Sequence, residues 1–301
     1  MSCLLHRGLE EAQLATTNRA LQLRVMTELV NGMHYSLTKG KGVERIPAYI
    51  GTVRDQTVQK MTGCPDPYAS LKRQSNETAL RLLPKLEDFV EAAKTSEIQF
   101  QRACIAASLG NVIEYGVSGH EIPWDTLDDM VSCAQEEMAI DETSLVWRLL
   151  QNTRSALFLT DNAGEIVFDR PLLKIISELG IKVTVAVKGA PVLNDATLED
   201  ASSARLDEFS EVITTGGSAV GVIPRWCSKD FLSRFDEVDL VIAKGMGHWE
   251  TLPEFSVPKP TAHLLRTKCE PVARSLGVSK GHNIVKLLKP HKGRFGPLTA
   301  K

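Results

Sequence analysis

Two patterns of hydrophobic residues divide the chain near residue 150. Before that point, apolar side chains recur at intervals of three and four residues, which predicts amphipathic helices. We expect these helices at residues 14–30, 76–93, 100–115 and 124–138. Residues 39–68 follow no such period and contain several glycines and prolines, so we expect a loop there that could cover a site.

After residue 150, short β-branched runs alternate with helical stretches. The expected strands are 155–160, 181–187, 211–215, 238–243 and 283–287, with helices at 165–179, 196–206 and 229–235 between them. Continuous apolar strands that alternate with helices predict an α/β fold with a parallel, doubly wound sheet. We therefore divide the chain into a helical N-terminal region, 1–150, and an α/β domain, 151–301. The basic tail from Lys289 to Lys301 is expected to be loosely ordered.

Composition narrows the choice of partners. The 301 residues are 43% hydrophobic, enough for a large core, and the net charge of −2 gives no electrostatic footprint for nucleic acid. The six cysteines contain no Cys-x-x-Cys pair, and free thiols favour a reducing compartment. No apolar run approaches the length of a membrane span, and the first residues lack the apolar centre of a signal peptide. We expect a cytoplasmic protein without nucleic-acid or membrane partners; the oligomeric state is not encoded in these patterns.

Oxygen-bearing side chains follow the first two expected strands. Asp161 and Asn162 come directly after the strand at 155–160, and Asp195 lies in the segment after the strand at 181–187. In an open parallel sheet, ligands bind at the carboxyl ends of the strands, and hard divalent cations prefer carboxylate and amide oxygens. Each residue alone also fits an ordinary turn or helix cap.

A lysine and two glycines follow the strand at 238–243. Lys244 supplies a positive charge suited to phosphate, and Gly245 allows backbone N–H groups to approach a ligand. The spacing matches neither a Walker A motif nor a dinucleotide fingerprint, and a flexible turn with a solvated lysine would look the same. Together, however, two acids, an amide and a lysine at three strand ends are the minimum set for phosphoryl chemistry. Because no Asp-x-Asp-x-Thr sequence is present, we favour attack by metal-bound water over a covalent phosphoenzyme.

These motifs occur in the same order in a known family. The chain resembles the damage-control phosphatases, first catalogued as domain of unknown function 89, and looks most similar to the branch that includes the phosphatase domain of vertebrate pantothenate kinase 4. The resemblance covers nearly the whole chain. Its marks are the segments 62–68, 110–111, 161–165, 194–197, 244–247 and 268–273.

The resemblance implies both a fold and a site. It implies a Rossmann-like, mostly parallel sheet with helices on both faces, preceded by an all-α N-terminal region. It implies a divalent metal (manganese, nickel, cobalt or magnesium) held by Asp161, Asn162 and Asp195, with Lys244 binding phosphate and Asn111 contributed by the helical part. We add Gly245 and Glu250 to the expected substrate contacts. The implied substrates are small phosphorylated metabolites, either damaged or surplus, such as sugar phosphates or 4′-phosphopantetheine.

The chain departs from the family pattern at three places. The family has an N-terminal Cys-x-x-Cys, of which only Cys3 is matched. His248 stands where the family often has Asn, and Glu114 stands where it often has Asp. These departures leave the role of the cysteine pair and the choice of metal and substrate open.

Two other functions remain compatible with the sequence. A sheet of this kind can hold S-adenosylmethionine, so a carboxyl methyltransferase is an alternative, although no Gly-x-Gly-x-Gly loop follows the first strand. A phosphometabolite-binding module without catalysis is the second alternative.

Overall fold

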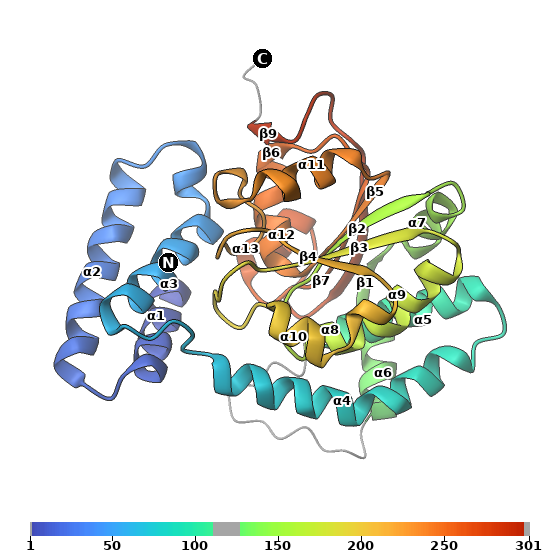
Figure 1. Cartoon of the computed structure of the whole chain (residues 1–301), viewed down its shortest axis with the longest axis horizontal. Helices are drawn as coiled ribbons and strands as arrows, with labels where there is room; N and C mark the ends of the chain where they lie inside the picture. Colours follow the sequence, from blue (N-terminus) through green and yellow to red (C-terminus); the bar gives the residue numbers. More distant parts are fainter. Residues whose placement is uncertain (1, 111–126, 298–301) are drawn as a thin grey trace.

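The structure is a computed structural model that describes residues 2–110 and 127–297. Three N-terminal helices pack together beside a large sheet, and the remaining helices lie along the sheet (Figure 1). The N-terminal helices are α1 (Ser2–Ala15), α2 (Arg19–Thr38) and α3 (Pro47–Thr62), with a short 3-10 helix, η1 (Gly42–Arg45), before α3.

The N-terminal helices correct two expectations. The helix expected at 14–30 is confirmed from residue 19, but its start is wrong, because Asn18 caps a new helix. The Asn18 side chain accepts a hydrogen bond from the Leu21 N–H at 3.1 Å. The expected loop at 39–68 is also wrong, since α3 fills much of it. Helix α3 starts with Pro47 in its first turn and ends at Gly63, which adopts the left-handed conformation with φ of 71°.

The next elements connect these helices to the sheet. They are α4 (Ala69–Glu91), α5 (Ser96–Leu109), α6 (Leu127–Glu136), β1 (Met138–Asp141) and α7 (Thr143–Leu150). The helices expected at 76–93 and 124–138 are therefore confirmed in kind, and α5 covers the start of the one expected at 100–115. Strand β1 lies before residue 150 and is an edge strand of the sheet. The division of the chain at 150 stays a prediction.

The seven-stranded sheet has the order β1-β8-β7-β5-β2-β3-β4. The strands after β1 are β2 (Ser155–Leu159), β3 (Lys182–Val187), β4 (Glu211–Thr214), β5 (Leu240–Lys244), β7 (Thr261–Arg266) and β8 (Asn283–Leu288). All neighbouring strands are parallel except β7 and β8. The expected α/β fold with a mostly parallel sheet is confirmed. All five expected strands are present, whereas β1 and β7 were not expected.

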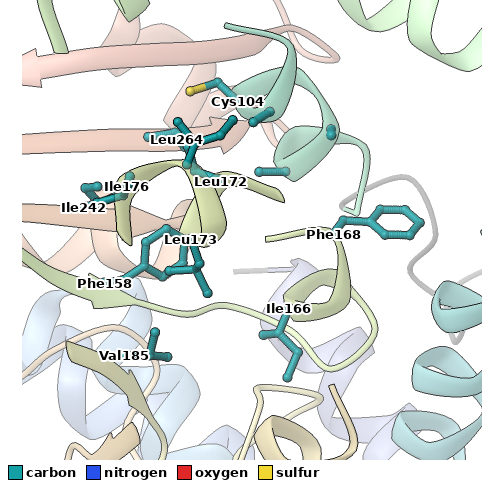
Figure 2. Close-up of a cluster of buried hydrophobic side chains, with 14 of the residues drawn as sticks. Cys104, Phe158, Ile166, Phe168, Leu172, Leu173, Ile176, Val185, Ile242 and Leu264 are labelled. Carbon is teal, nitrogen blue, oxygen red and sulfur yellow. The ribbon is translucent and has the colours of Figure 1, made fainter. Parts of the chain in front are cut away.

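Both faces of the sheet are covered, which is why its strands are apolar on both sides. The helices that follow β2 in the chain are α8 (Glu165–Phe168), α9 (Arg170–Glu178), α10 (Leu198–Ser203), α11 (Lys229–Glu237), α12 (Gly245–Thr251) and α13 (Glu270–Leu276). Three 3-10 helices lie between them: η3 (Leu206–Glu208), η4 (Pro224–Trp226) and η5 (Leu252–Glu254). On one face, Phe158 of β2 packs with Leu172 and Leu173 of α9 and with Cys104 of α5 (Figure 2). On the other face, Leu157 of β2 packs with Phe231 and Phe235 of α11.

The C-terminal tail is more ordered than expected. Residues Gly296–Pro297 form β9, which pairs antiparallel with β6 (Phe255–Ser256). The Phe295 ring stacks on Phe235, with ring centroids 4.2 Å apart. The expectation of a loose tail is thus wrong up to residue 297, because an aromatic side chain anchors it. None of the helices in the described part of the chain has the length and apolar character that a membrane span requires.

Candidate active site

Four parallel strands place their carboxyl ends along one edge of the sheet. These strands, β7, β5, β2 and β3, are consecutive in the sheet order. The segments that leave this edge carry Asp161 and Asn162 after β2, Asp195 after β3, Gly245 after β5 and Lys268 after β7. This edge is the usual position of a ligand site in an open α/β sheet.

The segments after β2 and β3 are joined directly by backbone hydrogen bonds. Asn162 and Asp195 form an isolated antiparallel bridge. The Ala163 N–H donates to the Asn194 carbonyl and the Ala196 N–H donates to the Asp161 carbonyl, each at 2.9 Å. The three residues expected to bind metal are therefore brought together by the backbone.

The side chain of Asn162 is oriented by carboxylates. Its Nδ2 donates to Asp161 Oδ2 at 3.1 Å and to Glu165 Oε2 at 3.2 Å. Because both carboxylates accept from the amide nitrogen, the amide oxygen is the atom that remains for a ligand. Helix α4 supports this loop, since Asn76 Oδ1 accepts from the Gly164 N–H at 2.6 Å and Asn76 Nδ2 donates to Asp200 Oδ1 at 2.9 Å.

The start of α12 lies directly against the carboxylate of Asp161. Gly245 has φ of +78°, and a Cβ built on it would lie 1.9 Å from Asp161 Oδ2. Only glycine fits both the conformation and the contact.

Burial and neighbouring carboxylates raise the pKa values of the carboxyl groups at this edge. Burial raises the pKa of Asp161 well above its ordinary value, Glu165 and Asp195 raise it further, and Lys268 and Lys244 oppose the shift. Burial also raises the pKa of Asp195 to about 6, against the effect of Lys188, whose Nζ lies 3.4 Å from Asp195 Oδ2. A bound cation would relieve this repulsion.

Comparisons with known proteins identify the family of this chain. Residues 1–284 match the family described as the damage-control phosphatase ARMT1-like domain. The chain is 36% identical over 290 residues to a damage-control phosphatase of Archaeoglobus fulgidus, which covers 96% of this chain and 97% of that protein. An uncharacterised protein of Methanocaldococcus jannaschii is 34% identical over 290 residues, covering 94% of this chain and 92% of that protein. The crystal structure of a DUF89 family protein from Pyrococcus horikoshii superposes with a TM-score of 0.82 at 30% identity, covering 94% of this chain and 95% of that one.

The chain belongs to the damage-control phosphatase family. The family and the named relative support a phosphatase role. This chain shares its fold with the Pyrococcus structure.

Lys244 is placed differently from what we expected for a phosphate-binding residue. Its Nζ is fully buried and donates to Glu165 Oε1 at 2.6 Å, Asp169 Oδ1 at 2.7 Å and the Ala107 carbonyl at 3.0 Å. Because an ammonium has three donors, all of them are used within the protein. Lys244 thus acts on the site through Glu165, which in turn accepts from Asn162.

The expected substrate residue Glu250 lines a groove whose described lining contains neither Asp161 nor Asp195. Glu250 lies on α12 and lines a groove of about 360 Å³ with Arg45, Pro47 and Pro271. Burial raises the pKa of Glu250 to about 7. Asn111 and Glu114 lie outside the residues that the structure describes.

Sequence analysis missed three charged residues of this edge. Lys268 affects the pKa of Asp161 from the end of β7, a strand that we did not expect. Lys188 follows β3, and its Nζ donates to the Gly221 carbonyl at 2.7 Å beside Asp195. Glu165 was read only as part of a helix start. For Lys268 and Lys188 a signal existed, since both follow a strand by one or two residues.

The described residues contain no group of three or more His, Cys, Asp or Glu side chains arranged to hold a metal ion. Two aspartates and an asparagine do not form such a group, because the third donor is an amide. The donor atoms of Asp161, Asn162 and Asp195 are all oxygens, which fits a hard divalent cation.

Proposed function

We propose that this chain is a metal-dependent phosphatase that hydrolyses small phosphomonoesters, with Asp161, Asn162 and Asp195 as the cation ligands. The observation that carries the proposal is the backbone bridge between Asn162 and Asp195, which joins the two oxygen-bearing segments at the carboxyl edge of the sheet. The family membership supports the same reaction class.

The residues present fit a divalent cation. Asp161 is surrounded by Glu165 and Asp195, and the orientation of the Asn162 amide leaves its oxygen for a ligand. When bound, such a cation neutralises phosphate charge and lowers the pKa of a coordinated water. Manganese, nickel, cobalt and magnesium remain the candidates, because an oxygen site accepts several of them.

The chain itself supplies orientation and charge. Lys268, partly exposed at the end of β7, is in a better position than the buried Lys244 to attract the phosphate. Gly245 allows the backbone of α12 to lie against Asp161, and Glu250 lines the groove in which the organic part of the substrate would lie. Sugar phosphates and 4′-phosphopantetheine are the substrate classes to test first. A cytoplasmic location stays a prediction.

The test is hydrolysis of p-nitrophenyl phosphate with added manganese, cobalt, nickel or magnesium. We expect activity in the wild type and its loss in Asp161→Asn, a substitution that preserves shape but removes the charge. Asp207→Asn, at an exposed aspartate of η3, is the matched control and should retain full activity. Wild-type activity in Asp161→Asn with an unchanged melting temperature would remove this assignment.

The same preparation separates the alternatives. A binding module would show a metal-dependent rise in melting temperature with phosphometabolites but no turnover over hours. A methyltransferase would bind S-adenosylmethionine tightly without metal, as measured by calorimetry.

A further inference from the structure

A second cavity lies away from the edge that carries Asp161. It has a volume of about 320 Å³, near the lower end of the range for small-molecule sites. It is lined by Leu252, Pro253, Val257, Lys259, Thr261, His263, Leu288, Lys289 and His291. The lining therefore combines apolar side chains with two lysines and two histidines and contains no acidic residue.

The antiparallel pair β7–β8 creates this concentration of positive charge. In the register of the two strands, Thr261 at the start of β7 lies opposite Leu288 at the end of β8. Lys259 before β7 and Lys289 after β8 are therefore neighbours at the same end of the pair. Thr261 also lies opposite Val241, near the start of β5, so this end of the sheet is the amino edge of the parallel strands. A five-residue strand separates the two edges by roughly 16 Å.

No carboxylate in the described part of the chain neutralises the charge of Lys259 or Lys289. Within residues 2–110 and 127–297, neither Lys259 nor Lys289 forms an ion pair with a carboxylate. Two ammonium groups beside apolar walls attract an anion more strongly than scattered surface lysines, because the apolar walls exclude water.

The two histidines of the lining differ in whether they can donate to a ligand in the cavity. His291 Nδ1 accepts a hydrogen bond from the Val257 N–H at 3.3 Å, so in the neutral ring the proton is on Nε2, which is free to donate. His263 is fully buried, and neither of its ring nitrogens has a hydrogen-bond partner among the described residues. Burial lowers the pKa of His263 to about 3, so the ring is neutral and carries one N–H donor. Because solvent does not reach these ring nitrogens, His263 belongs to the wall of the cavity and not to the groups that touch the anion.

We propose that this cavity is a second anion site, which binds a phosphate-type dianion through Lys259, Lys289 and the His291 Nε2–H. Two lysines favour a dianion over a monocarboxylate. The apolar walls formed by Leu252, Val257 and Leu288 also leave room for an organic group on the phosphate. The ligand is either free phosphate or a small organic phosphate, and the two share the same recognition chemistry.

The test is isothermal titration calorimetry of the full chain, treated with chelator, at constant ionic strength. The probes are inorganic phosphate, phenylphosphonate, which a phosphatase cannot hydrolyse, and acetate. The double variant Lys259→Ala/Lys289→Ala removes the charges of the cavity, and Lys94→Ala/Lys182→Ala removes two exposed lysines elsewhere as the matched control.

We expect the cavity variant to bind both dianions roughly tenfold more weakly or worse, while the control binds like the wild type and acetate binds poorly to all three. Tighter binding of phenylphosphonate than of phosphate identifies an organic phosphate as the ligand; equal binding identifies free phosphate. Equal affinities of the two double variants, or no dianion binding by the wild type, would overturn the proposal. The proposed active site also binds phosphate, so the effect of Lys259→Ala/Lys289→Ala is measured in the Asp161→Asn background as well. The same loss of affinity is expected in that background, so the second site and the proposed function fail independently.

Discussion

At position 245 any side chain would collide with the carboxylate of Asp161. We expect Gly245→Ala to abolish phosphatase activity, because the added Cβ displaces either Asp161 or the start of α12. Gly277→Ala is the matched control: Gly277 has φ of +72°, close to the +78° of Gly245, but no atom lies within 4 Å of the position that its Cβ would occupy. Both variants should lose about 1 kcal/mol of stability from the left-handed conformation.

Both variants are compared in an activity assay and in urea unfolding. The comparison separates the effect of the contact with Asp161 from the effect of the left-handed backbone conformation, which both variants share. If Gly245→Ala kept wild-type kcat and KM, Asp161 would have to move freely. The close approach described for the site would then have no functional role.

The two lysines of the site differ in what their removal should do. Lys244→Met leaves Glu165 and Asp169 as buried carboxylates without a cation, so we expect a loss of stability of about 3–5 kcal/mol. Lys268→Ala removes a partly exposed charge near Asp161, so we expect KM to rise roughly tenfold with a small change in stability. Urea unfolding and steady-state kinetics measure the two effects. A stable Lys244→Met protein with raised KM would instead restore Lys244 as a phosphate contact.

Residue types and strand ends sufficed to predict that Asp161, Asn162 and Asp195 would converge. These residues lie close together because parallel strands end at the same edge of the sheet, and the alternation of strands and helices in the sequence predicts parallel strands. The surroundings of Lys244 could not be predicted in this way, because its partners come from two helices, α8 and α5, that are distant from it in the sequence. Sequence patterns show which side chains follow the end of a strand, but they do not show which residues form hydrogen bonds with those side chains.

At the scale of elements, a buried hydroxyl of helix α3 forms a hydrogen bond with the loop after β4. Thr52 Oγ1 accepts from the Val220 N–H at 3.0 Å and donates to the Ala48 carbonyl at 2.8 Å. We expect Thr52→Val to cost about 1–2 kcal/mol, since it leaves a buried N–H unpaired without changing the size of the side chain.

Thr57 provides the control within the same helix. Its Oγ1 donates only to the Val53 carbonyl, one turn earlier, so Thr57→Val should change stability by a few tenths of a kcal/mol. Chemical denaturation of both variants measures the difference. Equal losses would mean that the contact between α3 and the loop does not contribute to stability.

Helix α3 escaped prediction because much of its buried face is polar. Thr52, Arg54 and Asp55 are almost fully buried, so the apolar periodicity that identifies amphipathic helices is weak. Strand β7 was missed for a related reason, since His263 interrupts a short apolar run. The existence of elements built on continuous apolar faces, such as β5 and the second half of α4, was predicted correctly.

For the whole molecule, the buried carboxyl groups determine how stability depends on pH. Burial alone raises the pKa of Glu250 from 4.5 to about 7. Between these values the folded protein binds more protons than the unfolded chain, so the contribution of Glu250 to stability is present below pH 4.5 and is lost as pH rises towards 7. Lowered pKa values of His248 and His263 act in the opposite direction below pH 6.5.

The variant Glu250→Gln isolates this contribution. We expect the difference in unfolding free energy between Glu250→Gln and the wild type to grow in favour of the variant from pH 4.5 to pH 7, by up to about 3 kcal/mol. Urea unfolding at several pH values, with chelator present, measures the difference curve. A difference that is independent of pH would mean that Glu250 is ionised normally in the folded protein.

The architecture was predictable at this scale because one regularity, the alternation of strand and helix, extends over half of the chain. The strand order and the antiparallel pairing of β7 with β8 could not be predicted, because hydrophobic periodicity does not show which strands become neighbours.

The hydrogen bonds that join residues 161–163 to residues 194–196 have a consequence for selectivity. If these segments hold the proposed cation, the backbone already fixes the two segments beside each other, so an arriving ion does not have to order a loop first. Discrimination between ions would then depend on intrinsic ligand affinity along the Irving–Williams series and on cellular availability rather than on conformational adaptation.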